Sequence, residues 1–392
     1  MIVDVDTHWE AISYESGEHP LAPWSDDLPS GVDMLAFGVA GDLLRALPES
    51  DRPTAHELLP ALVRKAADSG GPVVLHPLHE SSTAERVAWM DHVGIDHCLV
   101  NPGGYWQQVQ FVPRTDWPLA IERCNAFLGE QLEGTDRLHP VALADLSEPA
   151  LAVTQLEHAR ACGARAFFLS TENGRPQGGR SPGHPDLDPV WEAAVRLGMF
   201  AVIHVGNTES DFSGWADIEW RDERSAGIGG LVRLANTQRV HAAQNLIAGM
   251  LYGGVFARHP DLTVVLEEMK IGWLPWFVDA CTRQALSSPG LGDWPYDASG
   301  GDMLRRNVKI TPLPGLGDVD ALDVLVRLPE MCLFSSDYPH MEGNADPIAL
   351  YQPALDQLDA DLRARFLGDN AAAAFARTGD PLPQRRRQGG AH

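Results

Sequence analysis

Short apolar runs alternate with longer, helix-like stretches along most of the chain. The sequence opens with a β-branched run broken on alternate positions by polar residues, which predicts a first strand. Further strands are expected at residues 97–102, 138–146, 164–170, 199–205, 262–268, 308–311 and 332–336. The stretches between them predict helices at 119–133, 150–162, 189–197, 242–258, 273–285 and 319–328. Continuous apolar strands are typical of parallel sheets covered on both faces.

Eight strand–helix units in a chain of 392 residues predict an α/β fold of the (β/α)8, or TIM, barrel type. An open doubly wound sheet is the competing arrangement. Its commonest nucleotide-binding form is excluded because no GxGxxG motif follows the first strand. We expect a single domain over residues 1–378, with helical or irregular excursions at 11–90 and 207–240. The Pro/Gly-rich, basic end at 379–392 is expected to be a disordered tail.

Composition narrows the class of protein. The net charge of −24 argues against binding to nucleic acid or to an anionic membrane surface. The five cysteines are scattered, without a CxxC pair, which indicates reduced thiols and a cytoplasmic protein. The N-terminus has no pattern of a signal peptide, and no apolar run is long enough to span a bilayer.

Polar side chains follow several of the predicted strands. His8 and Glu10 lie two residues apart at the end of the first strand, so they share one face of it. Other strand ends carry His204, the pair Glu267 and Glu268, and Asp337 followed by His340. Active sites of these barrels lie at the carboxyl ends of the strands. Ionisable groups gathered there would be costly to bury without a cation, and His with carboxylate suits zinc, manganese or iron.

Each of these residues also has an ordinary structural interpretation. His8 and His204 could be satisfied core histidines, and Asp337 could cap the following turn. One of Glu267 and Glu268 should face outwards on a regular strand. The metal interpretation therefore depends on the joint pattern at several strand ends.

Three segments resemble a known family: DTHWE at the start, LIAGMLYGGVFARHPDLTVVLEEMKIGWLPWF at 246–277 and FSSDYPHMEG at 334–343. They are similar to metal-dependent TIM-barrel enzymes of the amidohydrolase superfamily. The branch in question includes aminocarboxymuconate-semialdehyde and resorcylate decarboxylases. The resemblance implies a barrel with metal ligands at His8, His204 and Asp337.

The same resemblance implies further ligands and some departures. Glu10 would be the second ligand of the first strand, and Glu268 stands where the decarboxylases often have histidine. His241 matches a pocket position of relatives, and Lys270 replaces a usual glycine. The full implied ligand set holds three imidazoles and three carboxylates: His8, Glu10, His204, His241, Glu268 and Asp337.

A carboxylate-rich set of this kind can hold two metal ions. It is similar to a small oxygenase branch on the same barrel, the nonheme diiron monooxygenases that hydroxylate a CoA-linked diterpenoid in platensimycin and platencin biosynthesis. That resemblance implies two Fe²⁺ ions, dioxygen and a bulky acyl-CoA substrate, with hydroxylation of an unactivated carbon. Glu10 and Glu268 favour this interpretation over the alternatives.

The main alternative is a decarboxylase or hydrolase of a small aromatic or acyl carboxylate that uses one Zn²⁺ or Mn²⁺ ion. Glu268, His241 or His340 would then move protons as catalytic groups. A barrel that only binds a ligand is a third class, and paired charges at the strand ends argue against it. The expected partners are a small-molecule substrate and, in a homodimer, a second copy of the chain.

Overall fold

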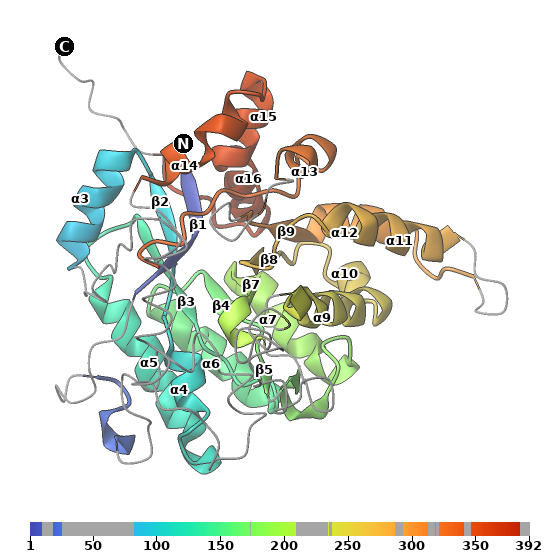
Figure 1. The fold of residues 1–392 in the computed structure, drawn as a ribbon. Helices are drawn as coiled ribbons and strands as arrows, with labels where there is room; N and C mark the ends of the chain where they lie inside the picture. Colours follow the sequence, from blue (N-terminus) through green and yellow to red (C-terminus); the bar gives the residue numbers. More distant parts are fainter. Residues whose placement is uncertain are drawn as a thin grey trace, which may run out of the picture.

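The computed structural model describes residues 1–9, 19–25, 82–172, 174–208, 234, 237–286, 293–312, 318, 321–340 and 346–384. Its main sheet has seven parallel strands in the order β1-β2-β3-β4-β7-β8-β9, curled and surrounded by helices (Figure 1). The strands are β1 (Val3–His8), β2 (His97–Asn101), β3 (Leu138–Ala142), β4 (Ala166–Phe168), β7 (Phe200–His204), β8 (Val264–Glu267) and β9 (Val308–Ile310). This arrangement confirms the predicted α/β fold and agrees with a TIM barrel.

The eighth strand, predicted at 332–336, is not a regular strand. Its segment bonds to both neighbours through isolated contacts. Leu333 N donates to Ile310 O of β9 at 2.9 Å, and Val5 N of β1 donates to Phe334 O at 3.1 Å. An isolated bridge also pairs Thr7 with Tyr338. We call residues 331–340 the closing segment, because its backbone joins the last strand of the sheet to the first.

Alternate residues of the strands enter two buried clusters. Val202 and Val265 belong to one cluster, whereas Ala201 and Leu266 belong to the other, which includes most of the helices' apolar residues. Both faces of the strands are therefore apolar, as the continuous runs predicted. The pairing of β1 with β2 shifts register between Asp4 and Thr7, close to the side chains of β1 that reach the candidate site.

Helices follow the strands in the expected alternation. They are α3 (Thr83–Val93), α4 (Tyr105–Val109), α5 (Trp117–Gln131), α6 (Pro149–Ala161), α7 (Asp188–Leu197), α9 (Val240–Tyr252), α10 (Val255–Arg258), α11 (Leu274–Leu286), α12 (Gly300–Asn307), α13 (Ala321–Arg327), α14 (Pro347–Leu355), α15 (Ala360–Ala364) and α16 (Asn370–Arg377). A short hairpin of β5 (Thr171–Glu172) and β6 (Arg175–Pro176) stands apart from the main sheet.

The helix predicted over 242–258 is two helices. It breaks between α9 and α10 at Gly254, whose φ of 79° is left-handed. A Cβ at the neighbouring Gly253 would collide with the backbone of Gly183, so these two segments of the chain approach closely there. Helix α12 lies between the predicted helix at 273–285 and the predicted strand at 308–311, where no helix was expected.

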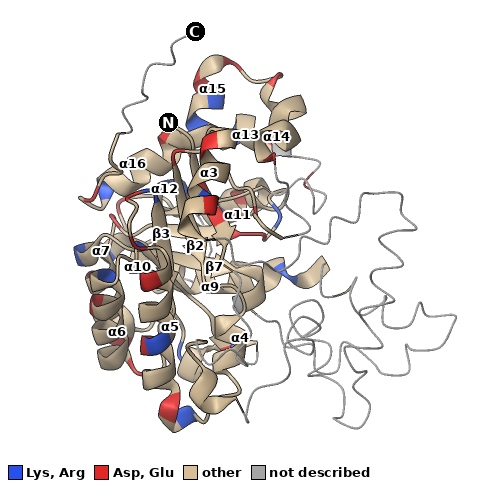
Figure 2. Cartoon of the chain, turned by 90° about the vertical axis from the view of Figure 1, so that its left-hand side faces the viewer, with Lys and Arg blue, Asp and Glu red and all other residues tan. Residues whose placement is uncertain are grey.

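Charged residues of both signs occur on the outer helices (Figure 2). Arg196 of α7, for example, pairs with Glu157 of α6 at 2.7 Å. Exposed pairs of this kind contribute little to stability. Among the described residues, no helix combines the length and the apolar character needed to cross a membrane.

A buried histidine pair gives the fold a testable pH dependence. His139 Nε2 lies 3.2 Å from His97 Nδ1, and burial, reinforced by the charge of Arg165, lowers the pKa of His139 well below its ordinary value. The folded state therefore keeps His139 neutral, whereas the unfolded chain takes up a proton near pH 6.5. The free energy of unfolding should fall as the pH drops below about 6.5.

We expect His139→Gln to reduce this slope by up to about 1.4 kcal/mol per pH unit, the value for one proton. Denaturant unfolding at several pH values between 5 and 7 measures it. His184→Gln, at a half-exposed side chain, is the matched control. Equal slopes in the wild-type protein and His139→Gln would contradict the assignment.

Candidate metal centre

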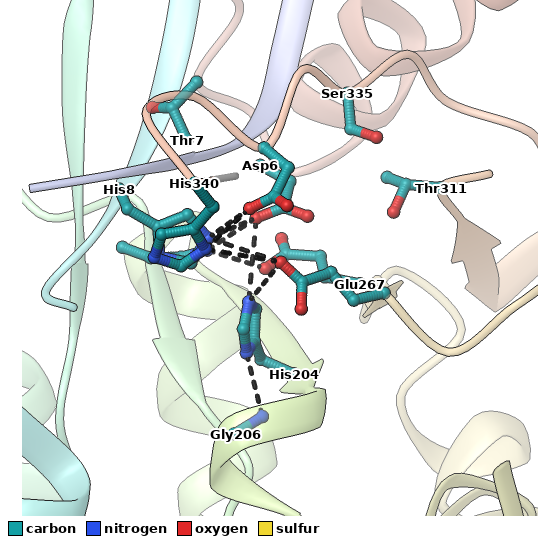
Figure 3. A network of polar contacts seen from close by, with 12 residues as sticks. Asp6, Thr7, His8, His204, Gly206, Glu267, Thr311, Ser335 and His340 are labelled. Atoms are coloured by element: carbon teal, nitrogen blue, oxygen red, sulfur yellow. Dashed lines mark hydrogen bonds and ion pairs between the residues drawn. The ribbon is translucent and has the colours of Figure 1, made fainter. Parts of the chain in front are cut away.

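Six ionisable side chains converge at the carboxyl ends of the strands (Figure 3). They form two groups, in each of which the candidate ligand atoms lie within 4.8 Å of one another. The first group is Asp6, His8, His204 and Glu268, and the second is His8, Glu268, Asp337 and His340. Because His8 and Glu268 belong to both, the groups are adjacent halves of one cluster.

The first group joins β1 and β7 to the residue that follows β8. His8 Nε2 lies 3.3 Å from Asp6 Oδ1 and 3.6 Å from Glu268 Oε1. His204 Nε2 lies 3.4 Å from the same Glu268 oxygen and 3.8 Å from Asp6 Oδ1. Two imidazole nitrogens and two carboxylate oxygens therefore face a common point.

The second group adds the closing segment. Asp337 Oδ1 lies 3.1 Å from His8 Nε2 and 2.8 Å from His340 Nδ1. His340 Nδ1 is also 3.8 Å from Glu268 Oε1, and its ring stacks on His8 with centroids 3.7 Å apart. Asp337 and His340 thus complete a second set of ligand atoms around the same nitrogen of His8.

The atoms that face one another are buried, and several lack hydrogen bonds. Within the described part of the chain, His8 Nε2, His204 Nε2, Glu268 Oε1 and both carboxylate oxygens of Asp337 have no hydrogen-bond partner outside the cluster, where they face one another only in the ion-pair contacts given above. All four residues are at most 6% exposed. Buried polar atoms are normally paired, and an unpaired charge inside a protein is costly. The donor set, imidazole plus carboxylate, is the one that zinc, manganese and iron bind, so these residues fit a metal ion.

Shifted pKa values reflect the crowding of negative charge. Burial and the neighbouring Glu268 charge raise the pKa of Asp337 well above its ordinary value, and burial with Asp6 does the same to the pKa of Glu267. Burial would also raise the pKa of Glu268, but His204, His340 and His8 hold it well below the usual range. Burial opposes a charge on His8, yet its carboxylate partners raise the pKa of His8. The cluster therefore needs positive charge, from protons or from a cation.

The backbone is unusual at two of the candidate ligands. Glu268 and Asp337 have φ values of 55° and 56°, in the left-handed region. Such angles are uncommon outside glycine, and they concentrate at functional sites. For Glu268 the angle follows the end of β8 at Glu267, which turns the side chain after the strand back toward the cluster.

Residues outside the two groups support their positions. Arg86 is buried and donates from Nη2 to the carbonyl of His8 at 2.6 Å, with its guanidinium 4.9 Å from the Tyr338 ring centre. A capping box of Ser82 and Glu85 fixes the start of α3, which carries Arg86. Arg86 therefore contacts both the end of β1 and the closing segment.

The structure brings together His8, His204, Glu268, Asp337 and His340, all named from the sequence. The expectation that Glu267 or Glu268 faces outwards is wrong: both are buried, at 0% and 3% exposure, because the strand ends between them.

Other sequence-based assignments lie elsewhere. His241 is exposed near the start of α9 and belongs to neither group, so geometry lends its assignment as a ligand or catalytic residue no support. Lys270, in the loop after β8, is also outside both groups. Glu10 lies outside the described residues, and its role as a ligand stays a prediction.

Asp6 was not among the predicted ligands. It lies two residues before His8, so the same strand alternation that paired His8 with Glu10 also places Asp6 on that face. With Asp6 and His340 in place of Glu10 and His241, the cluster again has three imidazoles and three carboxylates.

Asp6→Asn tests this assignment. The change keeps the shape of the side chain but removes the charge opposite His8 and His204, so we expect roughly tenfold weaker metal binding or more. Chelator competition measures it. Glu10→Ala is the companion variant, expected to lower the occupancy of a second metal ion. An unchanged metal-to-protein ratio would remove Glu10 from the ligand set, and unchanged affinity in Asp6→Asn would remove Asp6.

Comparison with known proteins decides the family. The sequence matches the Amidohydrolase family model over residues 3–377. The chain belongs to the amidohydrolase family. No curated protein matches it. The resemblance to amidohydrolase-superfamily enzymes is thereby confirmed at the level of the family.

Solved structures share the amidohydrolase fold at low sequence identity. An amidohydrolase from Mycobacterium avium subsp. paratuberculosis K-10 is 22% identical with a TM-score of 0.64, covering 95% of this chain and 98% of its own. 5-Carboxyvanillate decarboxylase from Sphingomonas paucimobilis is 19% identical with a TM-score of 0.59 over 96% and 98% of the chains. A dihydroxybenzoic acid decarboxylase from Polaromonas sp. JS666, solved with manganese and 2-nitroresorcinol, is 18% identical with a TM-score of 0.59 over 96% of both chains. At these identities the likeness concerns the fold.

Proposed function

We propose that the protein is a metal-dependent decarboxylase or hydrolase of a small aromatic or acyl carboxylate. The observation that carries the proposal is the buried cluster of imidazoles and carboxylates at the strand ends, whose facing atoms have no hydrogen-bond partner outside the cluster among the described residues. The decarboxylases among the similar structures support the substrate class, and three of those structures contain manganese. This proposal replaces hydroxylation as the leading interpretation.

The position of each cluster residue indicates whether it would bind the metal or exchange a proton. His8, Asp6, His204, Glu268 and Asp337 would hold a manganese or zinc ion, which supplies a Lewis acid for a carboxylate or an acidic bound water. His340 has a side chain 27% exposed, whereas the other five are at most 7% exposed. His340 is therefore the cluster residue best placed to exchange a proton with a substrate or with solvent.

Hydroxylation is a second candidate function. One observation favours it: the cluster contains six candidate ligand residues, three of them carboxylates, which is more than one ion usually needs. Two Fe²⁺ ions in such carboxylate-rich sites supply dioxygen chemistry. In this case the substrate would be a bulky acyl-CoA of the kind the diterpenoid monooxygenases hydroxylate.

One experiment separates the two functions. Zinc, manganese and iron are counted in protein purified without added metal, and the protein is then incubated anaerobically with hydroxybenzoates while CO₂ is measured. About one manganese or zinc per chain with anaerobic CO₂ release supports the decarboxylase. About two irons per chain with oxygen consumption on acyl-CoA substrates supports the monooxygenase. Metal-free protein whose melting temperature does not change with any of the three metals contradicts both.

A further inference from the structure

Asn101 lies at the end of β2, inside the ring of strands and beside the metal centre. It pairs in register with His8 of β1, and its backbone carbonyl accepts a hydrogen bond from Trp9 N at 2.8 Å. The residue is 1% exposed. Its backbone is thus fixed by the sheet, and its side chain points to groups that solvent does not reach.

The side-chain amide of Asn101 connects two carboxylates from different strands. Nδ2 donates to Asp6 Oδ1 at 2.9 Å and to Glu267 Oε2 at 2.9 Å. An amide nitrogen carries two hydrogens, so both bonds can form together. The Asp6 oxygen that receives this bond is the same one that faces His8 Nε2 and His204 Nε2.

These contacts also fix the orientation of the amide. With nitrogen and oxygen exchanged, the amide oxygen would face two carboxylate oxygens at hydrogen-bond distance and could donate to neither, whereas the nitrogen can donate to both. The oxygen is therefore on the other side. There, Asn101 Oδ1 has no hydrogen-bond partner among the described residues, and the same holds for Glu267 Oε1.

We propose that Asn101 is the positioning residue that decides which carboxylates face the metal. This inference rests on the proposed metal-dependent function. By donating to Asp6 Oδ1, Asn101 fixes the position of the oxygen that faces the two imidazoles. By holding Glu267 Oε2, it keeps Glu267 out of both ligand groups, although Glu267 is as deeply buried as Glu268. The metal would then be bound by Glu268 rather than by Glu267.

The test uses Mn²⁺ with the full-length protein, in chelator competition and in the EPR spectrum of bound Mn²⁺. Asn101→Leu keeps the size of the side chain and removes both donors. We expect its Mn²⁺ affinity to fall roughly 10- to 100-fold, the usual loss when a partner of a ligand is removed. The EPR line shape should also change, because Asp6 and Glu267 are free to rearrange. Asn101→Ser, too short to reach either carboxylate, should behave in the same way if Asn101→Leu does not fold.

A second-site change separates positioning from general packing. In Asn101→Leu combined with Glu267→Gln, the competing carboxylate is gone. Affinity and line shape should return toward those of the wild-type protein. Asn125→Leu is the matched control: Asn125 is buried and bonds to the backbone of Leu143 through both amide atoms, away from the cluster. It should lower the melting temperature without changing Mn²⁺ binding.

The outcomes are distinguishable. Wild-type protein that binds no metal contradicts the proposed function itself. Wild-type protein that binds Mn²⁺, with the same affinity and spectrum in both Asn101 variants, overturns the role of Asn101 alone. Loss of affinity that Glu267→Gln does not rescue would show that Asn101 does not act by keeping Glu267 from the metal, which also overturns the proposal.

Discussion

Glu268→Gln is expected to empty the metal centre, whereas Glu267→Gln is expected to leave the metal bound. Glu268 Oε1 lies within 3.8 Å of ligand nitrogens on three histidines, and Glu268 belongs to both ligand groups. Its loss therefore weakens both halves of the cluster at once. We expect Mn²⁺ affinity to fall by more than about 100-fold, since even indirect partners of ligands cost 10- to 100-fold.

The comparison with Glu267 makes this prediction specific. The two glutamates are adjacent in the sequence and both are buried, but Glu267 bonds to Asn101 and belongs to neither ligand group. Metal per chain after desalting, with turnover measured in parallel, gives the result. Equal metal content in the two variants would contradict the division of roles between them.

Asp337→Asn is expected to remove the metal and turnover together while the protein remains folded. Asn tolerates the left-handed backbone at this position, so its φ of 56° need not change. The charge beside His8 and His340 is lost, however, and both carboxylate oxygens are otherwise without hydrogen bonds among the described residues. We expect at least about a 100-fold loss of metal affinity on the same argument.

Asp145→Asn is the matched control for this variant. Asp145 is also buried, but it bonds to Ser147 and Arg114 and belongs to neither ligand group. It should lower the melting temperature with unchanged metal content. Wild-type metal content and turnover in Asp337→Asn would exclude Asp337 as a ligand.

The alternation of apolar runs and helical stretches was sufficient to predict the α/β fold. Apolar runs show where strands are buried but not where pairing stops: the run at 138–146 is paired only as Leu138–Ala142. The run at 332–336 is buried as predicted, yet it bonds to β9 and β1 through single contacts rather than as a ladder. The break between α9 and α10 depends on the close approach of Gly183, which is distant in sequence.

The candidate ligands at strand ends were predictable because the same apolar runs locate the ends of the strands. His8, His204 and Asp337 each follow an apolar run, and parallel strands bring such positions to one end of the barrel. The burial of Glu268 could not be predicted in this way, because it depends on a left-handed backbone turn that no pattern of polarity indicates. Asn101 and Arg86 act on the ligands from β2 and α3, and only the packed structure reveals those contacts.

The closing segment has a consequence for the motions of the barrel. Asp337 N donates to Asp6 O at 2.9 Å and His8 N donates to Tyr338 O at 2.7 Å, so residues more than 300 positions apart are joined. The side chains beside these bonds are the candidate ligands. A bound cation would therefore cross-link the two ends of the chain at the seam where the sheet is least regular. Backbone amides of Val5, His8 and Asp337 should then exchange their hydrogens with solvent more slowly in the metal-loaded protein, while those of β3 and β4, far from the seam, exchange at the same rate with or without metal.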